Sequence, residues 1–221
     1  SLWLWNGCIS PRMIYWKVKE FEKEVKKNQS TYWLIFELIW RDYFKYISLK
    51  HGNKIFQLEG IGKSERNWEI DKERFEKWAN GETGIPFIDA NMRELNSTGF
   101  MSNRGRQNVA SFLSKEVQLD WRMGAEYFES MLIDYDVASN YGNWMYVSGV
   151  GNDPRDRYFN IISQAKRYDA NGEFVKHWLP ELAEMDASNV HHPWTANQVL
   201  FSNDISYPKP MVEPDYWKKY Y

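Results

Sequence analysis

The most constraining feature of the sequence is a series of helix-like segments with no strand-like segment between them. Apolar residues recur at helical spacing, as at Ile14, Val18, Phe21 and Val25. Ser, Asn or Asp often precedes such a segment and glycine often follows it, as expected of helix caps. No stretch alternates apolar and polar residues as a half-buried strand does. The pattern predicts an all-α fold, and 221 residues suffice for one well-buried domain.

Caps and spacing together predict where these helices lie. They are expected at 11–27, 32–50, 72–78, 87–95, 103–119, 121–133, 154–166 and 173–182, with a loop over 53–70. Prolines at 193, 208, 210 and 214 predict an irregular tail over 186–221, which leaves the core at about 10–185. The apolar start at Ser1, without an initiator Met, predicts that the chain is part of a longer protein.

Composition limits the classes of function. A net charge of −2 gives no global attraction for nucleic acid, so such binding needs a local patch. The single cysteine, Cys8, excludes an internal disulfide and favours the cytoplasm or another reducing compartment. No apolar run reaches the ~20 residues of a membrane span. No metal motif, P-loop or GxGxxG in a strand–helix context is present, so we expect no metal site and any chemistry should come from a cofactor.

The segment 132–146 contains an unusual set of polar residues. Asp134, Asp136 and Asn140 follow an amphipathic stretch and lie among aromatic residues, with Gly142 expected to break the backbone pattern. Carboxylates and amides are costly to bury unless something pairs with them. The partner could be an arginine of this chain, a ligand, or both.

The predicted helix 32–50 carries a mixed face. Trp33, Glu37, Trp40, Arg41 and Phe44 follow one another at helical spacing and share one side. One interpretation is a Glu37–Arg41 pair at the rim of the core. The alternative is a cavity wall, with rings that stack on a ligand and charges that orient it.

A third cluster lies at a helix start. Asn103 and Arg106 share a face, whereas Arg104 points elsewhere, so we expect Arg106 to turn inward toward Asp134 or Asp136. Free N–H groups at this helix start, together with the arginines, form a plausible seat for an anion. By spacing alone, three tryptophans on separate segments are core residues: Trp78, Trp121 and Trp144.

Several runs of this sequence resemble the photolyase/cryptochrome family. They are WLIFELIWRDYF from Trp33, TGIPFIDANMREL from Thr83, TGFMSNRGRQ from Thr98, DWRMG from Asp120 and the run from Asp134 to Tyr146. The runs NRGRQ from Asn103 and WMY from Trp144 are most similar to the DASH cryptochrome branch. The resemblance extends to about residue 185 and implies the all-helical FAD domain. It further implies that the α/β antenna domain is absent, so we expect no antenna pigment.

The resemblance also implies roles for individual residues. Those around FAD are Trp33, Arg41, Asn103, Arg106, Asp134, Asp136 and Asn140, with Asn140 beside flavin N5. Those around a flipped-out pyrimidine dimer are Glu37, Trp40, Arg41, Arg104 and Tyr146. The catalytic pair is Asn140 and Glu37, and electron transfer from the surface to the flavin falls to Trp78, Trp121 and Trp144. The family's phosphate loop lies before Ser1, so fewer residues of this chain should hold the phosphates.

Three functions follow as expectations. The first is blue-light-driven repair of cyclobutane pyrimidine dimers, with single-stranded DNA as the partner. This strand preference is consistent with the near-neutral charge, because flipping a base costs least in a single strand. The second is a photoreceptor that signals to a protein partner through flavin photoreduction. The third is a helical binding module without a cofactor.

Overall fold

Helices make up the fold in the part of the chain that the computed structural model describes, namely residues 2–62, 66–153, 155, 158–195, 207–215 and 217. Within these ranges the β pairing consists of one isolated parallel bridge, between Glu69 and Leu119. The all-α prediction is confirmed. No helix within these ranges combines the length and the apolar character that crossing a membrane requires.

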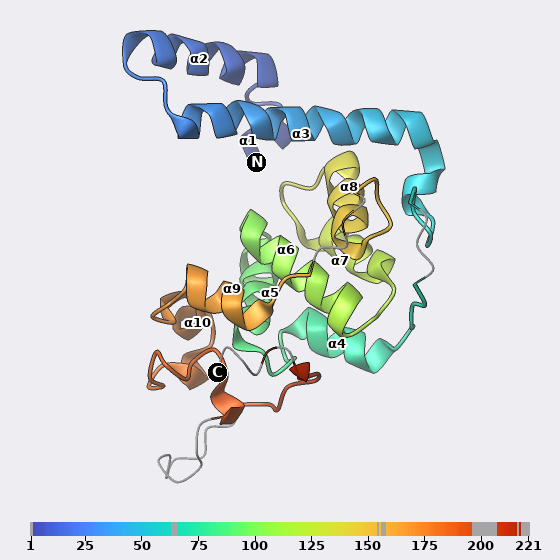
Figure 1. The fold of residues 1–221 in the computed structure, drawn as a ribbon, viewed down its shortest axis with the longest axis vertical. Coiled ribbons are helices and arrows are strands. Elements are labelled where there is room, and N and C mark those ends of the chain that lie inside the picture. Colours follow the sequence, from blue (N-terminus) through green and yellow to red (C-terminus); the bar gives the residue numbers. More distant parts are fainter. Residues whose placement is uncertain are drawn as a thin grey trace.

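The α-helices have the following bounds: α1 Leu2–Trp5, α2 Pro11–Glu24, α3 Gln29–His51, α4 Lys72–Asn80, α5 Pro86–Thr98, α6 Asn103–Ser111, α7 Trp121–Met131, α8 Val137–Ser148, α9 Ile161–Tyr168 and α10 Glu173–Trp178. Figure 1 shows α2 and α3 side by side across one end of the molecule, with α8 and α7 beneath α3 and with α9 and α10 toward the opposite end.

The long helix α3 is bounded by strong local signals. Asn28 and Thr31 form a reciprocal capping box at its start, and Gly52 ends it with a positive φ of 55°. In between, α3 packs against α2 on one side and against α8 on another. The contacts with α8 therefore fix the position of α3 relative to the rest of the domain.

Helix α8 was not predicted, and the expectation that Gly142 breaks the backbone pattern is wrong. The side chain of Asp136 caps α8 by accepting a hydrogen bond from Ser139 N at 2.8 Å, and the helix continues through Gly142. A Cβ at Gly142 would lie only 2.3 Å from the ring of Phe44. Glycine is needed here because α8 and α3 approach each other closely, not because the helix ends.

Three predicted helices differ from the structure by four residues or more at one end, whereas the other five differ by at most three at either end. The one expected at 154–166 begins at Ile161, where Asn160 caps it, while residue 154 lies outside the described ranges. The one expected at 173–182 ends at Trp178, and Pro180 starts a short 3₁₀ turn. The one expected at 103–119 is α-helical only to Ser111 and continues as a π-helical turn, Phe112–Glu116.

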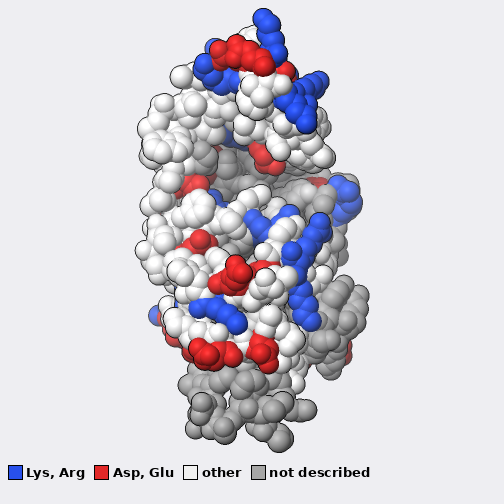
Figure 2. All heavy atoms as spheres, turned by 90° about the vertical axis from the view of Figure 1, so that its left-hand side faces the viewer, with Lys and Arg blue, Asp and Glu red and all other residues white. Residues whose placement is uncertain are grey.

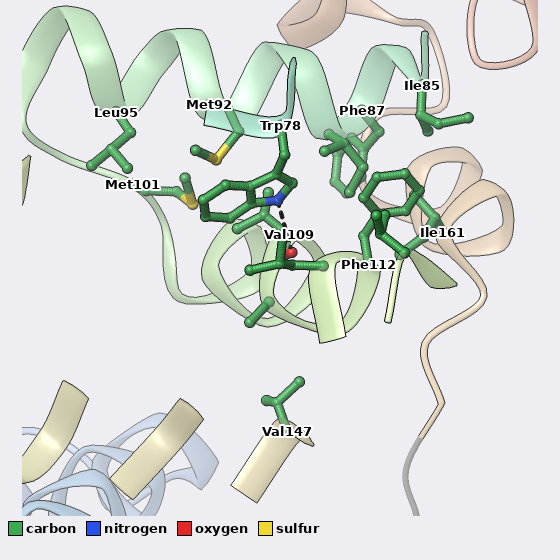
Figure 3. Close-up of a cluster of buried hydrophobic side chains, with 14 of the residues drawn as sticks. Trp78, Ile85, Phe87, Met92, Leu95, Met101, Val109, Phe112, Val147 and Ile161 are labelled. Atoms are coloured by element: carbon green, nitrogen blue, oxygen red, sulfur yellow. Dashed lines mark hydrogen bonds between the residues drawn. The ribbon is translucent and has the colours of Figure 1, made fainter. Parts of the chain in front are cut away.

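Trp78 lies at the centre of the core. Its side chain from α4 is 0 % exposed and points among Met92, Met101 and Val109 (Figure 3). The indole Nε1–H donates to the carbonyl oxygen of Val109 at 3.1 Å. Trp121 and Trp144 are also buried, which confirms the prediction that these three rings belong to the core.

Buried residues continue beyond the predicted limit of the core at about 185. Val190 and Trp217 are fully buried, although the described part of the tail is largely irregular. The backbone N–H of Met211 donates to Thr83 O at 2.8 Å, and the Tyr207 hydroxyl donates to the Asp89 carboxylate. These contacts fasten the tail to the start of α5.

The Asp89 carboxylate should make stability depend on pH. Burial raises the pKa of Asp89 to about 6, against the hydrogen bonds from Thr83, Tyr207 and Gly84, which lower it. Because the folded-state pKa exceeds the unfolded value of 3.8, the contribution of Asp89 to stability is fully present below pH 3.8 and is lost as pH rises through about 6. Thermal melts between pH 4 and pH 7 should therefore show a smaller decline in Asp89→Asn than in the wild type. Equal declines would contradict the assignment.

Candidate cofactor site

A cavity of about 490 Å³ lies between α3, α6 and α8. Figure 2 shows a hollow in the molecular surface below its upper end, which α2 and α3 form in Figure 1. The lining residues are Leu4, Trp5, Ile14, Leu34, Glu37, Leu38, Trp40, Arg41, Phe44, Asn103, Arg106, Gln107, Asp134, Asp136, Ser139, Asn143 and Tyr146. The cavity therefore combines carboxylates, guanidinium groups, amides and aromatic rings.

A second chamber of about 100 Å³ adjoins this cavity. Asn103, Arg106 and Asp134 line both spaces, whereas Asn140 and Trp144 line only the second. Together the two chambers bring five predicted cofactor residues to one place: Asn103, Arg106, Asp134, Asp136 and Asn140. Arg41, a sixth, lies on the α3 wall.

The ion pair between Arg106 and Asp134 organises the site. Arg106 Nη2 donates to Asp134 Oδ1 at 2.8 Å, and Arg106 Nε donates to the carbonyl oxygen of Met101 at 2.9 Å. The Asp134 side chain is 5 % exposed and that of Arg106 is 26 % exposed. The prediction that Arg106 turns inward toward an aspartate is confirmed. Asp136, in contrast, is used as the cap of α8.

Asn140 is held with its amide in the second chamber. Its Nδ2 donates to the carbonyl oxygen of Ala125 at 2.9 Å, which fixes the side chain against α7. Among the described residues, no hydrogen bond uses its Oδ1. An oriented acceptor on a largely buried side chain suits a ligand that carries an N–H group.

The mixed face of α3 is a cavity wall. Glu37, Trp40 and Arg41 all line the cavity, and Arg41 pairs with Asp42 at 3.6 Å rather than with Glu37. Among the described residues, the Glu37 carboxylate has no ion pair or hydrogen bond. Of the two interpretations of this face, the structure favours the cavity wall over the internal pair.

Two of the residues predicted to lie around FAD or the dimer line neither chamber. Trp33 is 47 % exposed and contacts Tyr32 and Phe36 on the outer side of α3. Arg104 donates to Gln107 Oε1 at 2.8 Å and lies 4.7 Å from the ring centre of Tyr168. The prediction that Arg104 points away from the face of Arg106 is confirmed.

Of the three predicted electron-transfer residues, Trp144 lines the second chamber and lies next to Trp78. The ring centres of Trp78 and Trp144 are 6.3 Å apart. Trp144 lies directly over Gly124, where a Cβ would be 2.2 Å from its ring, and Gly124 is one turn from Trp121 on α7. All three rings are buried, so none of them provides the surface end that the prediction requires.

Several cavity residues were missed by sequence reasoning. Ser139, Asn143 and Gln107 line the cavity, as do Leu4, Trp5 and Ile14 from α1 and α2. The spacing of Ser139, Asn143 and Tyr146 is that of one helix face, which would have identified them had α8 been predicted. The apolar residues of α1 and α2 carry no comparable signal.

The residues present fit a large, flat, polar cofactor. Aromatic rings and a shielded Arg106–Asp134 pair can hold a ring system, and Asn140 offers an unused acceptor. No group of three or more His, Cys, Asp or Glu side chains in the described ranges is arranged to hold a metal ion. The donor set therefore favours an organic cofactor.

Comparisons with known proteins agree with this site. Residues 33–220 match the family described as FAD binding domain of DNA photolyase. The chain is 54 % identical to a cryptochrome DASH from Danio rerio over 226 residues, which cover 100 % of this chain and 44 % of that protein. The chain thus spans less than half the length of this relative.

Solved structures show the same similarity. The structure of a Synechocystis cryptochrome matches with a TM-score of 0.91 and 54 % identity, over 96 % of this chain and 45 % of that one. A class III photolyase from Agrobacterium tumefaciens matches with a TM-score of 0.88 and 31 % identity, over 99 % and 47 %. The chain is therefore a helical FAD-binding domain of the photolyase/cryptochrome family, in its DASH cryptochrome branch.

Proposed function

We propose that this domain serves in the blue-light-driven repair of cyclobutane pyrimidine dimers in single-stranded DNA. FAD, once bound, supplies light absorption and one-electron chemistry. The protein binds and orients both the cofactor and the lesion. The observation that carries the proposal is a pair of aromatic rings on the cavity wall next to an unpaired carboxylate.

Trp40 and Tyr146 form this aromatic pair. Their ring centres are 6.0 Å apart at an interplanar angle of 72°, one ring from α3 and one from α8. Both line the large cavity together with Glu37. Two rings at a steep angle can contact the two linked bases of a dimer, and Glu37 can accept hydrogen bonds from their N–H edges.

Basic residues outside the cavity suit a phosphate backbone. Arg104 and Arg167 both lie against the ring of Tyr168, at 4.7 and 5.5 Å from its centre. Figure 2 shows Lys and Arg side chains gathered below the hollow on this face. A local basic strip beside a cavity supplies the attraction that a net charge of −2 does not.

On the cofactor side, the Arg106–Asp134 pair presents a fixed charge pattern, and Asn140 presents its free acceptor. The Ala125 carbonyl holds the Asn140 amide through its Nδ2, and Asn140 lines the second chamber. Because Asn140 lies nearly buried, it can bind a proton-bearing ring nitrogen without competition from water. The lesion residues thus line the larger cavity together with most cofactor residues, and Asn140 lines the chamber that adjoins it.

The direct test is repair of a single-stranded oligonucleotide that contains one dimer, under blue light and with reduced flavin. Restored thymines, measured by chromatography, support the proposal, and a dark reaction is the control. A protein that binds and photoreduces flavin but restores no thymine would contradict the repair function.

Trp40→Ala should weaken binding of the dimer-containing strand. Base–aromatic stacking contributes about 1–3 kcal/mol per base, so the dissociation constant should rise by about 5- to 150-fold. Fluorescence anisotropy with a labelled strand measures this change. Trp16→Ala on α2, an exposed tryptophan, is the matched control and should leave affinity unchanged. Equal losses in both variants would mean that Trp40 does not contact the lesion.

A second function, a blue-light photoreceptor, is favoured by the contact between Trp78 and Trp144 behind the chamber. Such contacts allow photoreduction without a DNA substrate. The two functions differ in DNA binding: a photoreceptor without repair should bind damaged and undamaged single strands equally weakly. A preference for the damaged strand favours repair.

A further inference from the structure

A group of side chains on the far side of Trp121 is not used by the proposed repair site. Trp121 contacts the ring of Tyr141, with ring centres 6.2 Å apart and an interplanar angle of 79°. Tyr141 is 6 % exposed and packs against Phe56 at 4.7 Å. Its hydroxyl donates to Oε2 of Glu129 at 3.3 Å, and Glu129 is exposed on α7. A buried tyrosine thus connects a buried tryptophan to a carboxylate in contact with solvent.

The surroundings of Trp121 make this connection significant. Its Nε1–H donates to the carbonyl oxygen of Leu58 at 3.0 Å. A carbonyl is a poor proton acceptor, so a Trp121 that has lost an electron cannot readily become neutral by releasing its proton there. Unless the electron returns from the flavin, an electron from a neighbouring side chain is needed to restore neutrality.

Tyr141 is suited to give that electron because its proton has a destination. Burial, together with the charge of Glu129, raises the pKa of Tyr141 to about 12, so the phenol is protonated at neutral pH. A protonated phenol loses an electron readily only if its proton leaves as well. Glu129 is placed to take this proton, because its carboxylate accepts the hydrogen bond from the Tyr141 hydroxyl.

A second tyrosine provides an internal comparison. Tyr127 contacts Trp78, with ring centres 5.8 Å apart. Its hydroxyl donates to Asn96 Oδ1 at 2.6 Å and approaches Ala79 O at 3.3 Å. Neither an amide nor a carbonyl oxygen takes a proton readily. Among the described ring contacts of Trp78, Trp121 and Trp144, only Tyr141 joins a tryptophan to a carboxylate.

We propose that Tyr141 is the electron donor that reduces oxidised Trp121, with Glu129 as the acceptor of its proton. One electron passes from Tyr141 to the Trp121 radical cation while the Tyr141 O–H bond breaks and its proton binds a Glu129 oxygen. The products are neutral Trp121, a neutral tyrosyl radical and a protonated Glu129. The inference rests on the second proposed function, photoreduction of bound flavin, because photoexcited oxidised flavin is the oxidant that removes the electron from the tryptophans.

The test is electron paramagnetic resonance of the FAD-loaded protein, frozen during blue-light illumination. The wild type should show a tyrosyl radical, which Tyr141→Phe should lose while a tryptophanyl radical remains. Glu129→Gln retains a hydrogen-bond acceptor but not a base, so it should reduce the tyrosyl signal as well. Formation of the tyrosyl radical should be slower in D₂O than in H₂O for the wild type. Tyr127→Phe, the matched control, should retain the wild-type signal.

The outcomes separate the two proposals. Photoreduction with only a tryptophanyl radical in the wild type would overturn the role of Tyr141 and leave the flavin function intact. Loss of the tyrosyl radical in Tyr127→Phe instead of Tyr141→Phe would also overturn it. A loaded protein that shows no photoreduction and no protein radical would overturn the role of Tyr141 together with the photoreceptor function, whereas repair is tested separately with flavin supplied in reduced form. Because Tyr141→Phe retains the ring and Glu129 is exposed, both variants should fold, which circular dichroism checks.

Discussion

Asp134→Ala is expected to lose FAD and to unfold at a lower temperature than the wild type. The substitution leaves the Arg106 guanidinium without its carboxylate at 2.8 Å, in a site where the Asp134 side chain is 5 % exposed. Breaking a buried pair typically costs roughly 3–5 kcal/mol, and the partial exposure of Arg106 favours the lower end. About 3 kcal/mol corresponds to a fall of about 6–12 °C in melting temperature for a chain of this size. Calorimetry of the apoprotein measures stability, and fluorescence titration measures FAD affinity.

A double variant separates the two effects. Asp134→Ala with Arg106→Met removes the unpaired charge and replaces it with an apolar side chain of similar length. Stability should largely return, whereas FAD affinity should stay low because both members of the ion pair are gone. If Asp134→Ala alone melted like the wild type and retained FAD, the ion pair would not be the organising element of the site.

Trp144→Phe is expected to abolish rapid flavin photoreduction while retaining bound FAD. Trp144 lines the smaller chamber and lies 6.3 Å from Trp78, ring centre to ring centre. Phenylalanine fills much of the same volume but is far harder to oxidise, so the first transfer from protein to photoexcited flavin should fail. Absorption spectra recorded during blue-light illumination measure the rate.

The control for this prediction is Trp178→Phe. Trp178 lies on α10 and contacts His177, and it does not line either chamber. Its replacement should leave the photoreduction rate unchanged. Equal rates in the wild type and in Trp144→Phe would mean that the electron enters by another route.

The parts of the site that sequence predicts well are those governed by local periodicity. The inward turn of Arg106 and the outward position of Arg104 follow from their spacing on one helix. The mixed face of α3 likewise gave a cavity wall as one of two interpretations, because Glu37 and Trp40 fall on one side, and the structure decides between them. In each case the angular position of a residue around the helix axis was enough to indicate which way its side chain faces.

Tertiary contacts decide the features that sequence missed. The local sequence does not show why residue 142 is glycine. Its packing partner, Phe44, is 98 residues away in the sequence and contacts it only in the folded protein. Trp33 shares the face of Trp40 by spacing, yet it lies beyond the cavity and is partly exposed. Trp217 lies in a Pro-rich tail, and its burial depends on the attachment of that tail near Thr83 and Asp89.

A crystal structure of the FAD-loaded protein tests most directly whether FAD occupies the space between α3, α6 and α8. We expect electron density for one FAD in the two adjoining chambers, with the flavin ring beside Asn140 and the Arg106–Asp134 pair. Density for FAD elsewhere, or chambers closed by the apolar side chains of Leu4, Trp5 and Ile14, would contradict this expectation.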